Sequence, residues 1–226
     1  MEIHPPAGSD GHNVSTDDHI VYIVDDDPRV REALTDLLES HGMHAASFGS
    51  AGEYVRAKTA DLPACLILDV ELPDINGLDL QGQIADGDHP PIVFITGHGD
   101  IPSSVRAIKH GAVDFLTKPF GDAELMAAVR SAIMQDRERR GQRAELGALR
   151  QRYLGLTQRE RDVLPLVVSG LLNKQAAAEL GISEVTLQIH RRNVLQKMGA
   201  ASLADLVRMA EKLDIPITHS RRTEGS

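Results

Sequence analysis

The chain has 226 residues, of which 42% are hydrophobic, and its 33 acidic and 24 basic side chains give a net charge of −9 at pH 7. This hydrophobic content is enough to form packed cores, so the composition excludes global disorder. The lone cysteine, Cys65, excludes an intramolecular disulfide framework. No apolar run approaches the roughly 20 residues of a membrane helix, and the N-terminus lacks the pattern of a secretory signal. We therefore expect a cytoplasmic protein with no membrane segment.

Charge divides the chain into two parts. Residues 1–130 carry 22 acidic and 8 basic side chains, whereas residues 150–226 carry 8 acidic and 12 basic ones. An acidic surface repels nucleic acid, and a mildly basic surface can approach it. The two parts therefore have different expected partners, although two ordinary solvated surfaces would give the same counts.

The predicted elements begin after a tail. Residues 1–18 are rich in Gly, Pro, Ser, Asp and His, which is typical of a flexible segment. Helical patterns then alternate with short apolar runs, which lie at 20–24, 43–48, 65–70, 92–96 and 113–117. Runs of this length are typical of buried strands, and their alternation with helices predicts an α/β domain over residues 19–134 with a parallel sheet. In this domain we interpret Cys65 as a core residue rather than a redox thiol.

A charged segment with few apolar positions follows this domain. We predict a helical linker over residues 135–153, weakened as a continuous helix by Gly141 and Gly147. Residues 154–215 then form a small all-α domain with four helices, which we expect over 158–169, 173–180, 184–198 and 202–212. Thr157 and Glu160 have the spacing of a capping box at the first of them. Residues 216–226 are predicted to be a C-terminal tail.

Polar side chains follow the predicted strands at the points where the strands end. They are Asp25, Asp26 and Asp27 after the first strand, Asp69 after the third, Thr96 after the fourth and Lys118 after the fifth. Because parallel strands end at one edge of a sheet, these side chains should converge there. Clustered carboxylates call for a cation, and all-oxygen ligands suit Mg²⁺. The cluster predicts a site that holds a phosphoryl group beside Mg²⁺, with Asp69 as the acceptor.

Each of these residues has a simpler explanation when it is taken alone. An Asp after a strand is often a helix cap, as Asp27 before Pro28 could be. A threonine at a strand end is ordinary. The joint pattern at successive strand ends favours the phosphoryl site over these separate explanations.

Residues 20–133 resemble the receiver domain of two-component response regulators. The motifs that carry this resemblance are VYIVDDDP, LILDVELPDINGLDL, VFITGHGD and GAVDFLTKPF, in that order. The resemblance implies a flavodoxin-like, five-stranded parallel sheet with strand order 2-1-3-4-5 and a cis Lys118–Pro119 bond. It also implies Asp69 as the phosphoacceptor, Thr96 and Lys118 as the other catalytic residues, Thr96 and Phe115 as the switch pair, and Asp25, Asp26, Asp69 and the backbone carbonyl of Glu71 as Mg²⁺ ligands.

Two further positions flank the expected phosphoryl group in similar domains. They are Glu71 and His98, which lie two residues after Asp69 and Thr96. We hypothesise that they set the lifetime of the acyl phosphate. The alternative is that both are exposed loop residues with no kinetic role.

The segment from Asn173 to Gly199 has the pattern of a helix-turn-helix. On a helical wheel, Leu187, Val194 and Met198 form one buried stripe, and mostly polar residues face the other side. Glutamine, asparagine and arginine on an exposed face suit base edges in a major groove, whereas nearby basic and hydroxyl side chains suit phosphates. The candidate DNA-binding residues are Lys174, Thr186, Gln188, Ile189, His190, Arg191, Arg192, Asn193 and Lys197. The alternative is a helical interaction module with a solvated basic face.

Residues 154–212 resemble the LuxR-type helix-turn-helix, through LTQRERDVLPLVVSGLLNKQAAAELGISEVTLQIHRRNVLQKMG. With the receiver in front, the whole chain resembles the NarL/FixJ family of response regulators and is nearer the FixJ side. Three departures from the family pattern are Ala176 in place of a branched apolar residue, Pro165 inside the first helix, and Gln188 where lysine is common. Ala176 affects local packing, Pro165 affects the geometry of the first helix, and Gln188 affects which operator sequence is recognised.

The resemblance implies a transcription regulator and not an enzyme. Its expected partners are a sensor histidine kinase, a double-stranded DNA operator, a second copy of the phosphorylated chain and RNA polymerase. Three alternatives remain. A metal-dependent phosphohydrolase with an Asp nucleophile usually has a second Asp where this chain has Glu71. A phosphorelay protein without DNA contact leaves the basic helix unexplained. A dinucleotide enzyme needs a G-x-G-x-x-G motif after the first strand, where this chain has none.

Overall fold

The computed structural model describes residues 18–84, 89–97 and 101–216. The chain divides into two compact units, Met1–Arg140 and Gly141–Ser226, which we call the N-terminal and C-terminal units. Among the described residues, no helix is both long and apolar enough to cross a membrane.

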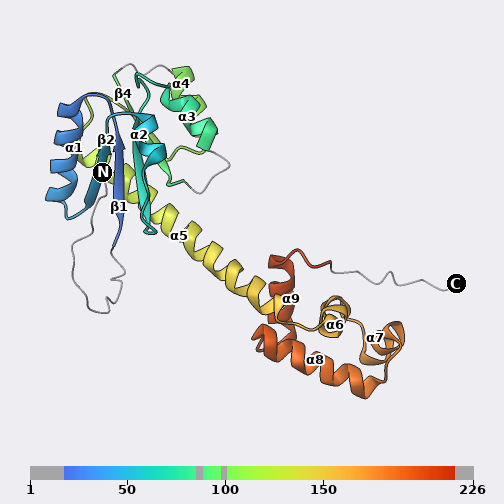
Figure 1. Cartoon of the computed structure of the whole chain (residues 1–226). Helices are drawn as coiled ribbons and strands as arrows, with labels where there is room; N and C mark the ends of the chain where they lie inside the picture. Colours follow the sequence, from blue (N-terminus) through green and yellow to red (C-terminus); the bar gives the residue numbers. More distant parts are fainter. Residues whose placement is uncertain (1–17, 85–88, 98–100, 217–226) are drawn as a thin grey trace. The chain divides into compact units, whose positions relative to one another are not determined.

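The N-terminal unit is built on one parallel sheet (Figure 1). Its strands are β1 Ile20–Val24, β2 His44–Phe48, β3 Ala64–Asp69, β4 Ile92–Thr96 and β5 Asp114–Thr117. They lie in the order β2-β1-β3-β4-β5, which confirms the strand order that the resemblance implied. The pairing is in register along the sheet, with Val24 opposite Leu68 and Asp69 opposite Ile95. The polar residues that follow these strands therefore emerge at one edge.

Helices cover both faces of the sheet (Figure 1). They are α1 Pro28–Ser40, α2 Ala51–Arg56, α3 Gly77–Ile84, α4 Ile101–Lys109 and α5 Asp122–Leu154. Alternate strand residues point to opposite faces. Val21 and Ile23 pack with α1 and α5, whereas Tyr22 and Val24 pack with α2, α3 and α4. Cys65 is fully buried in the first of these cores, and burial raises the pKa of its thiol, so it is a core residue.

The last helix of this unit continues far beyond the sheet. α5 is one helix from Asp122 to Leu154, and it passes through Gly141 and Gly147 without a break. Residues 135–153, which we predict from the sequence as a helical linker weakened by the two glycines, lie within this helix. A glycine in a helix interior costs only about 1 kcal/mol relative to alanine. That cost is offset because residues near each end of α5 are buried in a core, Val129 in the N-terminal unit and Leu149 in the C-terminal unit.

The C-terminal unit consists of the end of α5 and a group of short helices around one core. These helices are α6 Gln158–Val168, α7 Asn173–Leu180, α8 Glu184–Met198 and α9 Leu203–Lys212. The predicted capping box is present, since Thr157 and Glu160 exchange both hydrogen bonds. Pro165 lies inside α6 without ending it, and Ala176 is fully buried in the core.

Candidate functional site

Three carboxylates meet at the carboxyl edge of the sheet. Asp25 and Asp26 directly follow β1, and Asp69 is the last residue of β3. One oxygen from each lies within 4.8 Å of the others, which is the spacing of a metal site. Asp25 and Asp69 are buried, whereas Asp26 is exposed. All-oxygen donors that share negative charge suit a hard divalent cation, so the residues present fit such an ion.

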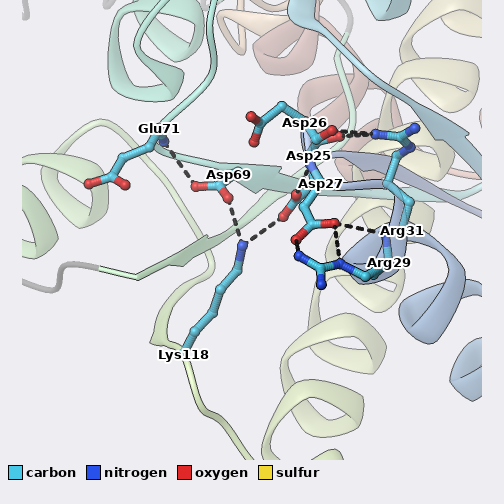
Figure 2. Close-up of polar contacts among 8 residues, drawn as sticks. All are labelled: Asp25, Asp26, Asp27, Arg29, Arg31, Asp69, Glu71 and Lys118. Atoms are coloured by element: carbon cyan, nitrogen blue, oxygen red, sulfur yellow. Dashed lines mark hydrogen bonds and ion pairs between the residues drawn. The ribbon is translucent and has the colours of Figure 1, made fainter.

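The ammonium group of Lys118 lies between two of these carboxylates (Figure 2). Its Nζ donates to Asp69 Oδ2 at 2.6 Å and to Asp25 Oδ2 at 2.7 Å. Burial lowers the pKa of Lys118, but hydrogen bonds and charge from Asp25 and Asp69 outweigh it, and the pKa is raised. Burial raises the pKa of Asp25 despite the opposing effect of Lys118. The site therefore combines a permanent cation with excess negative charge.

Backbone N–H groups orient the two buried carboxylates. Asp25 Oδ1 accepts from the Asp27 N–H, and Asp69 Oδ1 accepts from the Glu71 N–H, both at 2.9 Å. Figure 2 shows the Glu71 carboxylate directed away from Asp69. The backbone of Glu71, rather than its side chain, thus lies beside the cluster. His98, the other residue with a predicted effect on phosphoryl lifetime, lies outside the described residues.

Thr96 and Phe115 lie on neighbouring strands. Thr96 ends β4 and is fully buried, and its backbone carbonyl accepts from the Lys118 N–H at 2.7 Å. Phe115 in β5 is half-buried, and its ring centroid lies 6.1 Å from that of Phe94. The peptide bond from Lys118 to Pro119 is cis. All residues of the predicted phosphoryl site that the structure describes therefore come from this edge of the sheet.

Two residues that support the site were not predicted from the sequence. Arg31 Nη1 donates to the backbone carbonyls of Asp25 at 2.7 Å and Asp26 at 3.0 Å (Figure 2). Gly77 opens α3, and a Cβ at that position would lie 2.4 Å from the carbonyl oxygen of Asp69. Only glycine allows so close an approach. The DING sequence, whose glycine is Gly77 itself, is the one local signal that could have indicated this residue, and no local signal indicates Arg31.

The second candidate site is the exposed face of α8. α7 ends at Gly181, whose φ of 67° is left-handed, and Ser183 caps α8 by accepting from the Thr186 N–H. The predicted stripe of Leu187, Val194 and Met198 is buried, which confirms the orientation of the wheel. The opposite side of α8 therefore faces away from the core.

The predicted DNA-binding residues differ in their exposure and in their contacts within the unit. Lys174, Gln188, Ile189 and Arg192 are exposed, whereas His190 and Asn193 are half-buried. Three residues have partners within the unit: Thr186 Oγ1 contacts Ser183 Oγ at 2.8 Å, Arg191 Nη1 donates to Asn173 Oδ1 at 3.1 Å, and Lys197 Nζ donates to Glu160 Oε2 at 2.7 Å.

Comparisons with known proteins agree with this architecture. Residues 21–130 match the response regulator receiver domain, and residues 154–210 match the luxR family of bacterial regulatory proteins. The chain is 48% identical to nodulation protein W of Bradyrhizobium diazoefficiens, over 96% of both chains. It is 45% identical to the transcriptional regulatory protein FixJ of Azorhizobium caulinodans, over 84% of this chain and 90% of that one.

A solved structure, that of the response regulator StyR, is also similar. It has a TM-score of 0.77 and 45% identity, and the match covers 86% of this chain and 98% of that one. Family models for both units and relatives of this identity over nearly the whole length show the family. The chain belongs to the NarL/FixJ family of response regulators, which are DNA-binding transcription regulators with a receiver domain and a LuxR-type helix-turn-helix.

Proposed function

We propose that Asp69 accepts a phosphoryl group from a phosphohistidine of a sensor kinase, and that this modification controls binding of α8 to operator DNA. The observation that carries this proposal is the position of Lys118 Nζ between Asp69 Oδ2 and Asp25 Oδ2 beside an exposed carboxylate. A carboxylate nucleophile, an ammonium group and a set of oxygen ligands are the groups that phosphoryl transfer to an aspartate needs.

We assign Mg²⁺ to the carboxylate cluster. Asp25, Asp26, Asp69 and the backbone carbonyl of Glu71 would hold it, and when bound it would neutralise charge on the carboxylates and the phosphoryl oxygens. An Asp69 carboxylate oxygen attacks phosphorus, the bond from phosphorus to the donor imidazole nitrogen breaks, and that nitrogen keeps the electron pair. The Lys118 ammonium then exchanges its Asp69 contact for a phosphoryl oxygen.

Thr96 and Phe115 convert this local change into a conformational one. The Thr96 hydroxyl moves toward the phosphoryl oxygens, and Phe115 turns further into the space behind it. Support comes from the half-buried ring of Phe115, which lies next to Phe94, its partner residue in the pairing of β4 with β5. A charge added at Asp69 thereby biases a two-state element. The Glu71 position sets how fast water removes the phosphoryl group.

The phosphoryl step is tested with acetyl phosphate and Mg²⁺ on the full chain. Intact mass should show a gain of one phosphoryl group for the wild type and none for Asp69→Asn. Omission of Mg²⁺ in the presence of a chelator should prevent the gain. A gain in Asp69→Asn equal to that of the wild type would contradict the assignment of Asp69.

We assign DNA recognition to the exposed face of α8. Gln188, Ile189, Arg192 and Asn193 address base edges, and Lys174, Thr186, His190, Arg191 and Lys197 address phosphates. The exposure of Arg192 supports a base contact, and the Arg191 bond to Asn173 at the start of α7 supports a fixed phosphate contact.

Two single variants separate base contacts from phosphate contacts. Arg192→Ala should weaken binding to a preferred duplex more than to a scrambled one, and Arg191→Ala should weaken both alike. Affinities measured over a series of salt concentrations provide the test, since phosphate contacts release counterions. Equal losses on both duplexes for both variants would contradict this division.

We also propose that the phosphorylated chain dimerises through α4. Ile101, Val105 and Ile108 lie on one side of this helix, and they are 79%, 45% and 48% exposed. Such a row of exposed apolar side chains is typical of an interface. A second copy with the same row would bury it and would place two α8 helices on a near-palindromic site.

A charge placed in this row tests the dimer. After treatment with acetyl phosphate and Mg²⁺, Val105→Lys should remain a monomer in size measurements while still gaining the phosphoryl mass. Val55→Lys, at a position in α2 that is 60% exposed, is the matched control and should dimerise like the wild type. A Val105→Lys chain that dimerises normally would exclude this face.

A further inference from the structure

One apolar residue of α8 is unexplained by the core and by the proposed DNA contacts. Val185, in the first turn of the helix, is 68% exposed, and Ile189 one turn later is 55% exposed. Other apolar side chains of this helix, Leu187, Val194 and Met198, are buried. The exposure of Val185 therefore follows from its position on the helix and not from a loosely packed unit.

Val185 begins a straight row along the helix. At about 100° per residue, Val185, Ile189, Arg192 and Gln196 fall within about 60° of one another. The buried stripe lies on the opposite side. This row is thus the centre of the exposed face, whereas Gln188 and Asn193 lie on its two flanks. The row combines two apolar side chains near the start of the helix with two hydrogen-bonding ones near its end.

The surroundings of the row identify the partner by its chemistry. Arg191 and Arg192 in α8 and Lys174 in α7 carry positive charge on the same helix pair, and this suits a polyanion. The N-terminal residues of a recognition helix reach base edges in the major groove. The apolar group that DNA presents in that groove is the C5-methyl of thymine.

A role in folding does not account for the choice of valine. At 68% exposure Val185 adds little to the core, and a β-branched residue is a weaker helix former than alanine. Ser183 and Gly199 cap the two ends of α8, so the ends of the helix are fixed without Val185.

We propose that Val185 is a specificity-determining residue that contacts the methyl group of a thymine in the operator. This inference rests on the proposed function of α8 in DNA recognition. It adds a base contact one helical turn before Ile189, and it predicts a thymine at a fixed distance from the base that Arg192 reads.

Replacement of thymine by uracil tests this contact, because it removes the methyl group and keeps every hydrogen-bonding atom of the base. The full chain, treated with acetyl phosphate and Mg²⁺, is first used to select a preferred duplex from random ones. Each thymine of that duplex is then replaced in turn, and the affinities of the wild type and of Val185→Ala are measured.

At one thymine per half-site, uracil should weaken wild-type binding about threefold to fivefold, the effect of one buried methyl group. Val185→Ala should bind the thymine and uracil duplexes equally well at that position. Ile189→Ala should lose sensitivity at a different thymine. Leu172→Ala, at a position 69% exposed outside α8, is the matched control and should keep the full wild-type pattern.

The outcomes separate this inference from the function on which it rests. If Val185→Ala keeps the wild-type ratio of thymine to uracil affinity at every position, the contact does not exist. If Val185→Ala binds too weakly to measure, Val185→Thr, which keeps the shape and one methyl group, should show a reduced ratio, and an unchanged ratio would overturn the proposal. Absence of salt-sensitive binding to any duplex by the wild type would instead overturn the proposed function.

Discussion

Lys197 Nζ lies 2.7 Å from Glu160 Oε2, and this ion pair joins α8 to the first turn of α6. The Glu160 side chain is 3% exposed, and the same oxygen accepts from the Thr157 N–H at 2.8 Å. Burial raises the pKa of Glu160, but hydrogen bonds from Lys197 and Thr157 outweigh it, and the pKa is lowered. The ammonium group of Lys197, a residue of the predicted DNA-binding helix, is therefore paired with a buried carboxylate of the same unit.

Loss of this ion pair should destabilise the C-terminal unit. Lys197→Met leaves a buried carboxylate without its cation, and since Lys197 is 41% exposed we expect a discounted loss of about 1–2 kcal/mol in unfolding free energy. Hydrogen exchange at α6 and α8 amides measures it. Lys174→Met, which removes the same charge from an exposed position of α7, should leave protection unchanged. Equal protection in both variants would show that the pair contributes nothing.

The stabilisation by Glu160 should depend on pH. Because its pKa in the folded chain is below the ordinary value, the contribution is complete above the unfolded pKa and is lost as pH falls through the folded pKa. The difference in unfolding free energy between the wild type and Glu160→Gln should therefore shrink from about pH 7 to about pH 3. Urea unfolding of both chains across this range provides the measurement. A difference in unfolding free energy that grows as the pH falls would contradict this prediction.

Asp136 should be a strong contributor to the stability of the N-terminal unit. Its side chain is buried, and Oδ2 accepts from the Ala64 N–H at 2.9 Å and from Arg140 Nε at 2.8 Å. Asp136→Ala leaves both donors without this acceptor and should cost about 3 kcal/mol. Asp136→Asn, which keeps an oxygen acceptor, should cost less.

The matched control for Asp136 is Asp61, whose side chain is fully exposed and pairs with the same Arg140. Asp61→Ala should cost much less than Asp136→Ala, because exposed ion pairs contribute little to stability. Denaturant unfolding gives all three values. Similar losses for Asp61→Ala and Asp136→Ala would place the effect in Arg140 rather than in the buried carboxylate.

Arg31 should position the carboxylates for Mg²⁺. It holds the backbone carbonyls of Asp25 and Asp26, whereas Arg29 contacts the Asp27 carboxylate (Figure 2). Arg31→Gln and Arg29→Gln each remove one positive charge near the site. This loss of charge alone would strengthen Mg²⁺ binding in both variants. Because only the first releases the backbone, Arg31→Gln should bind Mg²⁺ about tenfold more weakly than Arg29→Gln. Calorimetric titration compares them, and equal affinities would deny Arg31 this role.

Gly199 should be less replaceable than Gly181. Both have left-handed φ, at 69° and 67°, but a Cβ at Gly199 would lie 2.9 Å from Arg152 Nη1, and one at Gly181 would meet nothing within 4 Å. Arg152 Nη1 donates to the Met198 carbonyl at the end of α8. Gly181→Ala should cost about 1 kcal/mol, and Gly199→Ala about 1 kcal/mol more.

A double-mutant cycle checks this difference. In an Arg152→Ala background, the two glycine substitutions should cost the same, because the guanidinium that a Cβ would displace is gone. If Gly199→Ala still costs more stability than Gly181→Ala in that background, the difference arises from the backbone conformation and not from Arg152.

Local sequence pattern was enough to predict the helices, the strands and the polar cluster at the carboxyl edge of the sheet. The β-branched content and the length of short runs such as 20–24 and 92–96 favour buried strands, and the structure places strands there. Asp25, Asp69 and Lys118 could be grouped before any coordinates, since parallel strands end at one edge. Caps such as Thr157 and Glu160 are equally local, so spacing alone predicts them.

Contacts between distant segments, and the exposure of single residues, could not be predicted from local pattern. The continuous α5 overrides two glycines because cores near both of its ends hold it. Neither the Lys197 contact with Glu160 nor the approach of Gly77 to Asp69 follows from spacing, because each requires two elements to be packed first. The exposure of Val185 likewise depends on which side of α8 the core covers. Local sequence pattern specifies the secondary structure of a segment, and tertiary packing specifies which side chains and backbone groups it contacts.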